Sequence, residues 1–286
     1  MNSSGCFGGT DNTHSEFSEA KVVVLPIPFD GTSTWIKGAD KGPFAILEAS
    51  QALELYDIET DSEVYKKGIH TCEALKADVL PEEMVKKVRE KVSELLRSDK
   101  FVVSLGGEHS VTIGAVKAYK EKYNNLSVLQ LDAHADLRDE YQGSKFNHAC
   151  VMSRVKEIAL TAQVGIRSID IEEKEKIDDA SVFFARDIVA KEEKYIDKVL
   201  NVLTDDVYIT IDLDVFDPAI MPSTGTPEPG GLLWYQVLEL LKNVSEKKNI
   251  VGFDIVELCP NESNKAPDFT AAKLIYKLLS YVFCQG

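Results

Sequence analysis

The chain has 286 residues, of which 44% are hydrophobic and 28% are charged. This composition is typical of a globular protein with a sizeable core, and no apolar run is long enough to span a bilayer. The formal net charge of −15 argues against nucleic-acid binding, which favours basic patches. Such acidity suits a well-solvated surface or, alternatively, the attraction of a cationic substrate.

Two features of the chain bear on its compartment. The amino-terminal segment MNSSGCFGGTDNTHSEF is polar and lacks the basic start and apolar stretch of a secretory signal. The five cysteines are scattered and form no CxxC pair, so neither a disulfide framework nor a thiolate zinc site is expected. We therefore expect a cytoplasmic protein with reduced cysteines.

Short apolar segments alternate with amphipathic ones from Lys21 onward. Residues 1–18 are expected to form a flexible arm and residues 19–286 a single catalytic domain, because no linker or repeat interrupts the chain. Several apolar segments are nearly continuous runs of Val, Ile and Leu, as in strands buried on both faces of a parallel sheet. In chain order, the segments predicted to be strands are 21–27, 68–74, 101–107, 126–136, 160–166, 181–185, 206–214 and 249–257.

Four amphipathic stretches are predicted to be helices. The stretch 81–99 begins at a proline, carries acids in its first turn and has apolar residues at helical spacing. The other three cover 192–203, 232–244 and 268–283. The alternation predicts an α/β fold, a single three-layer domain with a mostly parallel central sheet flanked by helices. Ligands of such folds bind beyond the carboxyl ends of the strands.

Residue types that bind metals follow one strand segment, in DAHAD at residues 132–136. Alternate residues of an extended chain point to one face, so Asp132, His134 and Asp136 are expected to converge if that geometry persists beyond the strand. The two alanines between them leave room for close approach of an ion. Carboxylate oxygen and imidazole nitrogen together suit Mn²⁺, Fe²⁺ or Zn²⁺.

Two further strand segments end in polar motifs. In DLDVFDP, Asp212 and Asp214 are expected to share one face, and acids so close behind a buried strand are costly unless they are paired or bind a cation. Asp217, before a proline, is expected to shape the turn. In GGEHS, the glycines are expected to allow a sharp turn that presents His109, and Ser110 to cap the next helix.

Together the three motifs supply two histidines and four aspartates at strand ends. This is too many carboxylates for one closed zinc site, and it suits two metals that share carboxylates and activate a bridging water. The alternatives are a single Mg²⁺ or an ion-pair network with arginine.

In order and spacing, GGEHS, DAHADLRDEY, NHAC, DLDVFDPAIMPSTGTPEPGGL and DIVEL resemble motifs of the ureohydrolase family of arginases and agmatinases. The resemblance runs from residue 21 to the last predicted helix and looks closer to agmatinases, although Ser223 stands where those often carry glycine. It implies the arginase fold, two Mn²⁺ ions per subunit and a homo-oligomer, a trimer or hexamer. The implied ligands are His109, Asp132, Asp136 and Asp212 for one metal, and Asp132, His134, Asp212 and Asp214 for the other.

The resemblance also implies roles for residues outside the ligand motifs. His148, in NHAC, matches the catalytic histidine that moves protons, and its alternative is a structural loop histidine. Glu257, in DIVEL, matches the glutamate that binds the guanidinium, and by itself it would read as an ordinary strand-end acid. Thr226 matches a threonine that lines the same pocket, and Asp214 would help to stabilise charge that develops on the substrate.

The implied reaction is hydrolysis of a small cationic guanidino substrate to urea and an amine. Agmatine, which would yield putrescine in polyamine biosynthesis, is the first expectation, and aminopropylagmatine, guanidinobutyrate, arginine and formiminoglutamate are the alternatives. Arg138, Asp139 and Tyr141 are candidates for contact with the substrate tail, or else form a solvated loop. A non-catalytic, metal-binding oligomer is the alternative from another class, and a phosphoesterase is disfavoured because no glycine-rich phosphate cradle accompanies the motifs.

Overall fold

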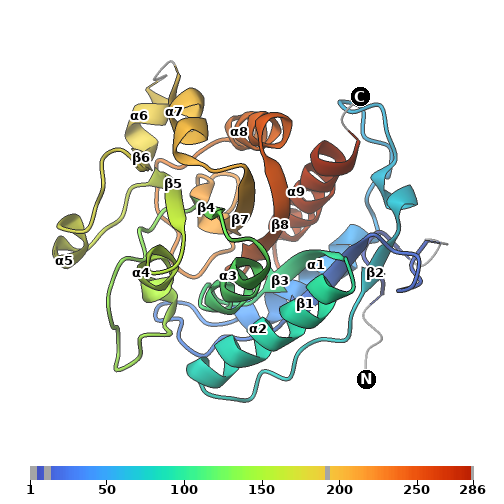
Figure 1. Ribbon diagram of the computed structural model, residues 1–286, viewed down its shortest axis with the longest axis horizontal. Helices are drawn as coiled ribbons and strands as arrows, with labels where there is room; N and C mark the ends of the chain where they lie inside the picture. The colour runs from blue at the N-terminus through green and yellow to red at the C-terminus, as the bar shows by residue number, and fades with distance from the viewer. Residues whose placement is uncertain (1–4, 10–13, 191–193, 285–286) are drawn as a thin grey trace.

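The computed structural model describes residues 5–9, 14–190 and 194–284, and a parallel β-sheet runs through its centre (Figure 1). The sheet has eight strands among these residues, in the order β2-β1-β3-β8-β7-β4-β5-β6. Each predicted strand segment contains one of them, which confirms the predicted α/β fold. The strands are β1 (Val22–Ile27), β2 (Ile69–Thr71), β3 (Phe101–Gly106), β4 (Leu126–Leu131), β5 (Leu160–Ile166), β6 (Val182–Phe184), β7 (Asp206–Asp212) and β8 (Asn249–Val256).

Helices connect the strands and cover both faces of the sheet. The four predicted helices are observed as α2 (Pro81–Arg97), α7 (Tyr195–Val202), α8 (Trp234–Lys247) and α9 (Ala266–Phe283). The helix expected after Ser110 is α3 (Val111–Lys122). Helix α1 was not predicted, although a proline stands in its first turn, where this residue favours a helix start. The remaining helices are α1 (Gly42–Ser50), α4 (Val151–Lys156), α5 (Ile171–Lys174) and α6 (Ala185–Val189).

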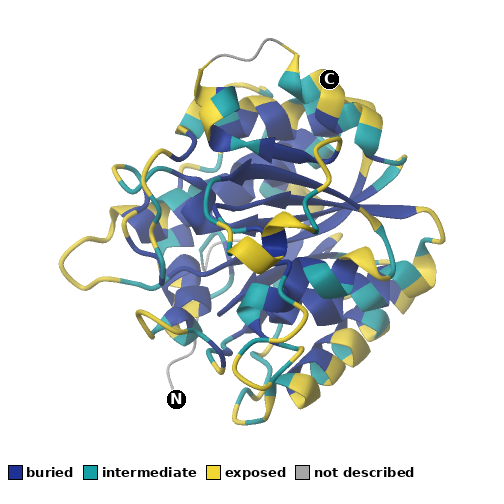
Figure 2. Ribbon diagram, turned by 90° about the vertical axis from the view of Figure 1, so that its left-hand side faces the viewer, coloured by how far each residue is buried: buried dark blue, intermediate teal, exposed yellow. Residues whose placement is uncertain are grey.

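Alternate residues of each central strand point into two separate cores. Val22 and Val24 of β1 pack in a cluster with α1, α7, α8 and α9, whereas Val23 and Leu25 pack in a cluster with α2, α3 and α4. The strands are therefore buried on both faces, as their continuous apolar sequences predict. Figure 2 shows this as buried strands between helices whose exposed residues lie on the outside.

The amino-terminal segment contributes to the packing. Phe7 is fully buried in the core cluster of α1 and α9, and its backbone amide donates to Thr71 Oγ1 at 2.9 Å. Of the arm expected at residues 1–18, positions 1–4 and 10–13 lie outside the described residues. No helix within the described part of the chain has both the length and the apolar character that crossing a bilayer requires.

The order of the strands decides where the site lies. Strands β3, β8, β7 and β4 are consecutive neighbours in the sheet, although they are far apart in the sequence. Because all neighbours are parallel, their carboxyl ends lie at one edge, where ligands of such sheets bind. The motifs GGEHS, DIVEL, DLDVFDP and DAHAD follow these four strands.

A buried ion pair ties α9 to the loop after α1, and we expect it to be important for stability. Lys277 is 4% exposed, and its Nζ lies 3.0 Å from Asp57 Oδ2 and 2.9 Å from Glu59 Oε2. Replacing Lys277 with methionine leaves the Asp57 charge buried without a cation, which should lower the free energy of unfolding by about 3–5 kcal/mol at neutral pH. Urea denaturation measures the change, and Lys273→Met on the same helix serves as the control.

The effect of Lys277→Met should depend on pH in a defined direction. Burial acts to raise the pKa of Asp57, but Lys277 and the backbone amide of Thr60 outweigh it and hold the pKa below its ordinary value. The lowered pKa contributes stability that is present above the unfolded pKa and is lost as the pH falls through the folded value. The difference between the two proteins should therefore shrink in acid, and equal stability at neutral pH would contradict the assignment.

Candidate active site

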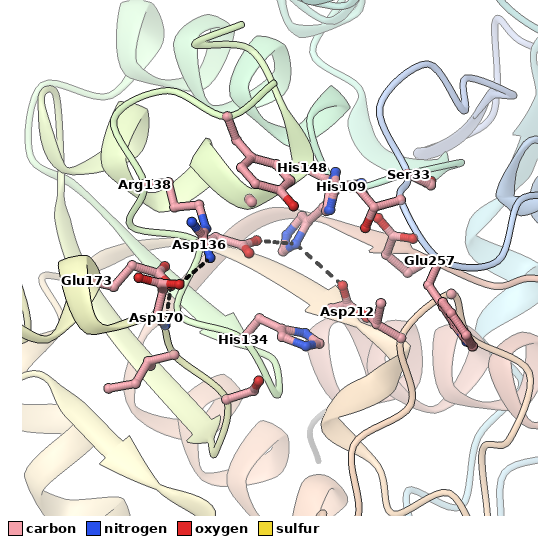
Figure 3. A pocket seen from close by; sticks show the side chains of 18 of the residues that line it. Ser33, His109, His134, Asp136, Arg138, His148, Asp170, Glu173, Asp212 and Glu257 are labelled. Atoms are coloured by element: carbon pink, nitrogen blue, oxygen red, sulfur yellow. Dashed lines mark hydrogen bonds and ion pairs between the residues drawn. The ribbon is translucent and has the colours of Figure 1, made fainter. Parts of the chain in front are cut away.

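A cavity of about 230 Å³ opens at the carboxyl edge of the sheet (Figure 3). Side chains at or just after the ends of β3, β4, β7 and β8 line it from the edge of the sheet, and residues of the segments 33–36, 138–149 and 168–173 complete its lining. Figure 3 shows His109, Asp136 and Asp212 directed toward one another, with Glu257 and Ser33 on one side and Arg138, Asp170 and Glu173 on the other. The predicted site residues that line this cavity are His109, His134, Asp136, His148, Asp212, Thr226 and Glu257.

His109 lies at the centre of a group of carboxylates. Its Nδ1 is 3.1 Å from both Asp132 Oδ2 and Asp136 Oδ2, and 3.5 Å from Asp212 Oδ2. This nitrogen is buried and makes no hydrogen bond among the described residues. His109, Asp132 and Asp212 place one ligand atom each within 4.8 Å of one another, a spacing that fits one metal ion.

A second group shares Asp132 with the first. His134 Nδ1 lies 2.9 Å from Asp214 Oδ2 and 3.6 Å from Asp132 Oδ1, and the three residues again fit one metal ion. On the far side of the ring, His134 Nε2 is 3.9 Å from Glu228 Oε1. Two adjacent groups that share a carboxylate are the arrangement of a two-metal centre. Asp212, which the sequence places in both ligand sets, belongs by this spacing to the first group only.

The local backbone differs from the extended chain that the alternation of DAHAD suggests. Strand β4 ends at Leu131, and His134 forms an isolated parallel bridge with Ser168. Asp136 has a φ of 53°, so the extended geometry ends before this residue. Its carboxylate nevertheless returns to His109, because the chain turns at this point instead of continuing straight.

A turn, and not a continuing strand, also places Asp214. After β7 the chain forms a 3-10 helix over Leu213–Val215, and Asp212 Oδ1 accepts the backbone N–H of Asp214 at 2.9 Å. Asp214 Oδ1 in turn accepts the N–H of Ala133 at 2.9 Å, which joins the two aspartate motifs. Asp217 accepts the amides of Ala219, Gly230 and Gly231, as expected of a residue that shapes a turn.

In the GGEHS motif, Gly107 and Ser110 have other structural roles than those predicted from the sequence. Gly107 has no left-handed φ, but a Cβ there would lie 2.1 Å from the backbone oxygen of Phe29, so the glycine permits close packing of two loops. The prediction that Ser110 caps α3 is wrong, because its side chain makes no cap hydrogen bond. Its Oγ donates instead to Glu108 Oε1 at 2.5 Å.

The electrostatics of the cluster favour a bound cation. Burial raises the pKa of Asp212 well above its usual range, and the charges of Asp214 and Asp132 add to the effect. Burial acts to lower the pKa of His109, but the carboxylates of Asp132 and Asp136 outweigh it and raise the pKa. A divalent cation would neutralise these acids directly, so the donor set fits the metal centre that the motifs imply.

A buried network behind His109 holds its ring. Its Nε2 lies 2.8 Å from Thr210 Oγ1, which donates to Asp254 Oδ1 at 2.6 Å. Thr112 and Tyr208 donate to the other oxygen of the same carboxylate at 2.9 and 2.7 Å. Such partners fix the orientation and the tautomer of a histidine ligand, and here they leave Nδ1 for the metal.

His148 begins a short 3-10 helix that lines the cavity wall. Burial, together with the charges of His134 and His109, lowers the pKa of its ring to about 4. The ring is therefore neutral at neutral pH, and it can take up a proton before giving one away. Its Nδ1 contacts Thr32 Oγ1 at 3.2 Å, a partner that the sequence motifs did not reveal.

Glu257 directly follows β8 and lines the same cavity. Its φ of 66° is left-handed, which is unfavourable for a residue with a side chain and is typical of functional positions. One oxygen, Oε1, accepts the backbone N–H of His109 at 2.7 Å. Burial and the nearby charge of Glu108 raise the pKa of Glu257 well above its usual range. A cationic ligand in the cavity would stabilise the ionised form.

The outer wall carries charges that the motifs only partly indicated. Arg138 and Tyr141 line the cavity, and Arg138 Nη2 lies 2.9 Å from Asp170 Oδ2. Asp139 does not line it and pairs instead with Lys176 at 2.8 Å. Asp170 and Glu173, next to Arg138, were not predicted, since their segment contains no recognisable motif.

Known proteins resemble this chain over almost its whole length. A family model described as the arginase family matches residues 20–280. An N(1)-aminopropylagmatine ureohydrolase from Synechocystis sp. is 40% identical over 278 residues, 93% of this chain and 90% of that protein. An agmatinase from Pyrococcus horikoshii is 35% identical over 267 residues, 92% of this chain and 93% of that protein. The crystal structure of an agmatine ureohydrolase of Thermoplasma volcanium has a TM-score of 0.87 and 35% identity, covering 96% of this chain and 94% of that one.

Proposed function

Because this chain belongs to the arginase family, we propose that it is a two-manganese ureohydrolase that splits a guanidine with a cationic tail into urea and an amine. The observation that carries the proposal is the pair of ligand groups sharing Asp132, beside a cavity lined by His148 and Glu257. Carboxylate oxygens with imidazole nitrogens suit Mn²⁺, Fe²⁺ or Zn²⁺, and of these the family resemblance favours manganese. When bound, the two ions would lower the pKa of a water and so supply hydroxide near neutral pH.

The protein residues have separate tasks in this proposal. Glu257 has one oxygen bonded to the His109 amide, and its other oxygen can receive the guanidinium of the substrate. Thr226 lines the cavity and would contact the same group. His148 would take up a proton at its ring and pass it to the leaving amine. Asp214, held by the Ala133 amide, would help to stabilise charge that develops on the substrate.

The outer wall favours a long, positively charged tail. The two carboxylates of Asp170 and Glu173 lie near one cation, Arg138, so this part of the cavity lining has one more negative charge than positive charges. Trp35, which also lines the cavity, is 76% exposed. Aromatic faces and carboxylates attract ammonium groups. An arginine would also bring an α-carboxylate toward these acids, which disfavours it. The chain's net charge of −15 adds to the attraction of a cation.

Agmatine and aminopropylagmatine both have such a tail. The sequence motifs favour agmatine, with putrescine as its product. The higher identity to an aminopropylagmatine ureohydrolase, 40% against 35% for an agmatinase, favours the longer compound. We therefore propose aminopropylagmatine as the better substrate and agmatine as the second. The proposal includes a cytoplasmic homo-oligomer, a trimer or hexamer, which light scattering would test.

A urea-release assay with the manganese-loaded protein tests the proposal. One added ammonium near Asp170 should stabilise the bound substrate and its transition state by up to about 1 kcal/mol. We therefore expect kcat/KM for aminopropylagmatine to exceed that for agmatine by about fivefold. Asp170→Asn should remove much of this preference, while Asp139→Asn, which alters an acid outside the cavity, should not. Arginine and guanidinobutyrate should react far more slowly. Bound manganese without urea from any of these guanidines would favour a non-catalytic binding protein instead.

A further inference from the structure

A buried chain of hydrogen bonds stands behind His148. Thr32, which is 7% exposed and lies in the loop after β1, has its Oγ1 3.2 Å from His148 Nδ1. The same oxygen accepts the backbone N–H of His148 at 2.9 Å. On its other side it donates to Oε2 of Glu108, at 2.8 Å. One hydroxyl therefore contacts the histidine twice and the glutamate once.

Glu108 is surrounded by hydrogen-bond donors, although burial raises its pKa to about 7. The residue is fully buried, and besides Thr32 it receives the amide of Ser110 at 3.1 Å and the Oγ of Ser110 at 2.5 Å. Its own backbone N–H donates to Phe29 O at 2.8 Å, which ties its loop to the loop that carries Thr32. The position of Thr32 relative to the glutamate is thus set by both backbone and side-chain bonds.

This geometry determines which ring nitrogen of His148 carries the proton. A threonine hydroxyl has one hydrogen to donate and two lone pairs to accept with. Its hydrogen goes to Glu108, and one lone pair takes the backbone N–H of His148. The contact with Nδ1 can then be a hydrogen bond only if Nδ1 carries the proton. A neutral ring so arranged has its lone pair on Nε2.

We propose that Thr32, backed by Glu108, is a positioning residue that holds His148 in the Nδ1–H tautomer and leaves Nε2 to exchange protons in the cavity. The inference rests on the proposed hydrolysis of a guanidine. The oxygen of the attacking water bonds to the guanidine carbon, and the proton that this water releases bonds to Nε2. The carbon–nitrogen bond of the resulting intermediate then breaks, and the same proton passes to the leaving nitrogen. The ring begins and ends the cycle in one tautomer, which Thr32 keeps in place.

Two substitutions at Thr32 distinguish the effect of its hydroxyl group from the effect of its side-chain volume. Thr32→Val retains the side-chain volume and removes the hydroxyl. It should lower kcat about 100-fold and leave KM and bound manganese nearly unchanged, because general acid–base catalysis contributes a rate enhancement of about 10² or more. Thr32→Ser retains the hydroxyl and should restore most of that loss. Thr270→Val on α9 is the control for a threonine outside the site. If Thr32→Val is as active as the unaltered enzyme, or if Thr32→Ser loses as much activity, the proposal is overturned.

A second variant excludes a purely structural role. In a His148→Ala background, Thr32→Val should reduce kcat by less than about twofold further, because both changes remove the same function. If Thr32→Val lowers kcat as strongly in the His148→Ala background as in the unaltered enzyme, positioning through His148 is contradicted. A neutron structure of the metal-loaded enzyme gives a readout independent of turnover and should show deuterium on Nδ1 and none on Nε2. That result would stand even if no guanidine released urea, whereas deuterium on Nε2 alone would overturn the inference.

Discussion

The His134→Ala variant is expected to bind one manganese ion per chain instead of two and to lose at least about 100-fold in urea release. Removing a residue that hydrogen-bonds to a metal ligand typically lowers metal affinity or activity about 10- to 100-fold, so removing a ligand itself should lower them more. His134 suits this test because its side chain is 26% exposed and makes few structural contacts, whereas Asp132 and Asp214 also bond backbone amides.

The metal content and the rate of the His134→Ala variant are measured together. Elemental analysis counts the ions, and thermal unfolding shows whether the fold persists. His70→Gln is the matched control, since His70 bonds the backbone oxygen of Ser15 at 2.8 Å outside the site and should retain both ions. Unchanged turnover with two ions bound in His134→Ala would refute the assignment of the second ligand group.

Glu257→Gln should leave both metals in place and reduce kcat/KM by about 100- to 1000-fold. Glutamine can still accept the His109 amide through its oxygen, so the local backbone should be retained. Its neutral amide cannot pair with a guanidinium, and two charge-assisted hydrogen bonds are worth about 3–4 kcal/mol together. The loss should appear in kcat/KM because the interaction holds the reacting group itself.

The control for Glu257→Gln is Glu262→Gln, an exposed acid in the loop after β8 that should change nothing. Urea release and metal content are measured for both proteins across several agmatine concentrations. A Glu257→Gln enzyme with full metal content and unaltered kcat/KM would show that the guanidinium binds elsewhere in the cavity.

Much of the fold was predictable because its signals are local. Continuous runs such as VVVLPI in β1 predict strands buried on both faces, and the amphipathic pattern with a leading proline predicts α2. The two histidines and four aspartates of the candidate centre could also be named from the sequence. Their residue types and their position after strands carry the chemistry, whatever the backbone does between them.

Other features depended on contacts between distant segments. The bond between Thr32 and His148 joins residues separated by 116 positions, and the bond between His109 and Glu257 joins residues separated by 148. The left-handed backbone of Asp136 and the 3-10 turn that contains Asp214 also cannot be inferred from an alternating pattern of acids.

The fold class and the chemical identity of the candidate metal ligands can be inferred from the amino-acid sequence alone, because periodicity and residue type act over a few residues. That β3, β8, β7 and β4 lie side by side is seen only in the folded chain. That order brings the four motifs to one edge, where His109 faces three carboxylates and where His148 and Glu257 line the same cavity. The pairing of strands depends on the packing of the whole sheet, which no single segment specifies.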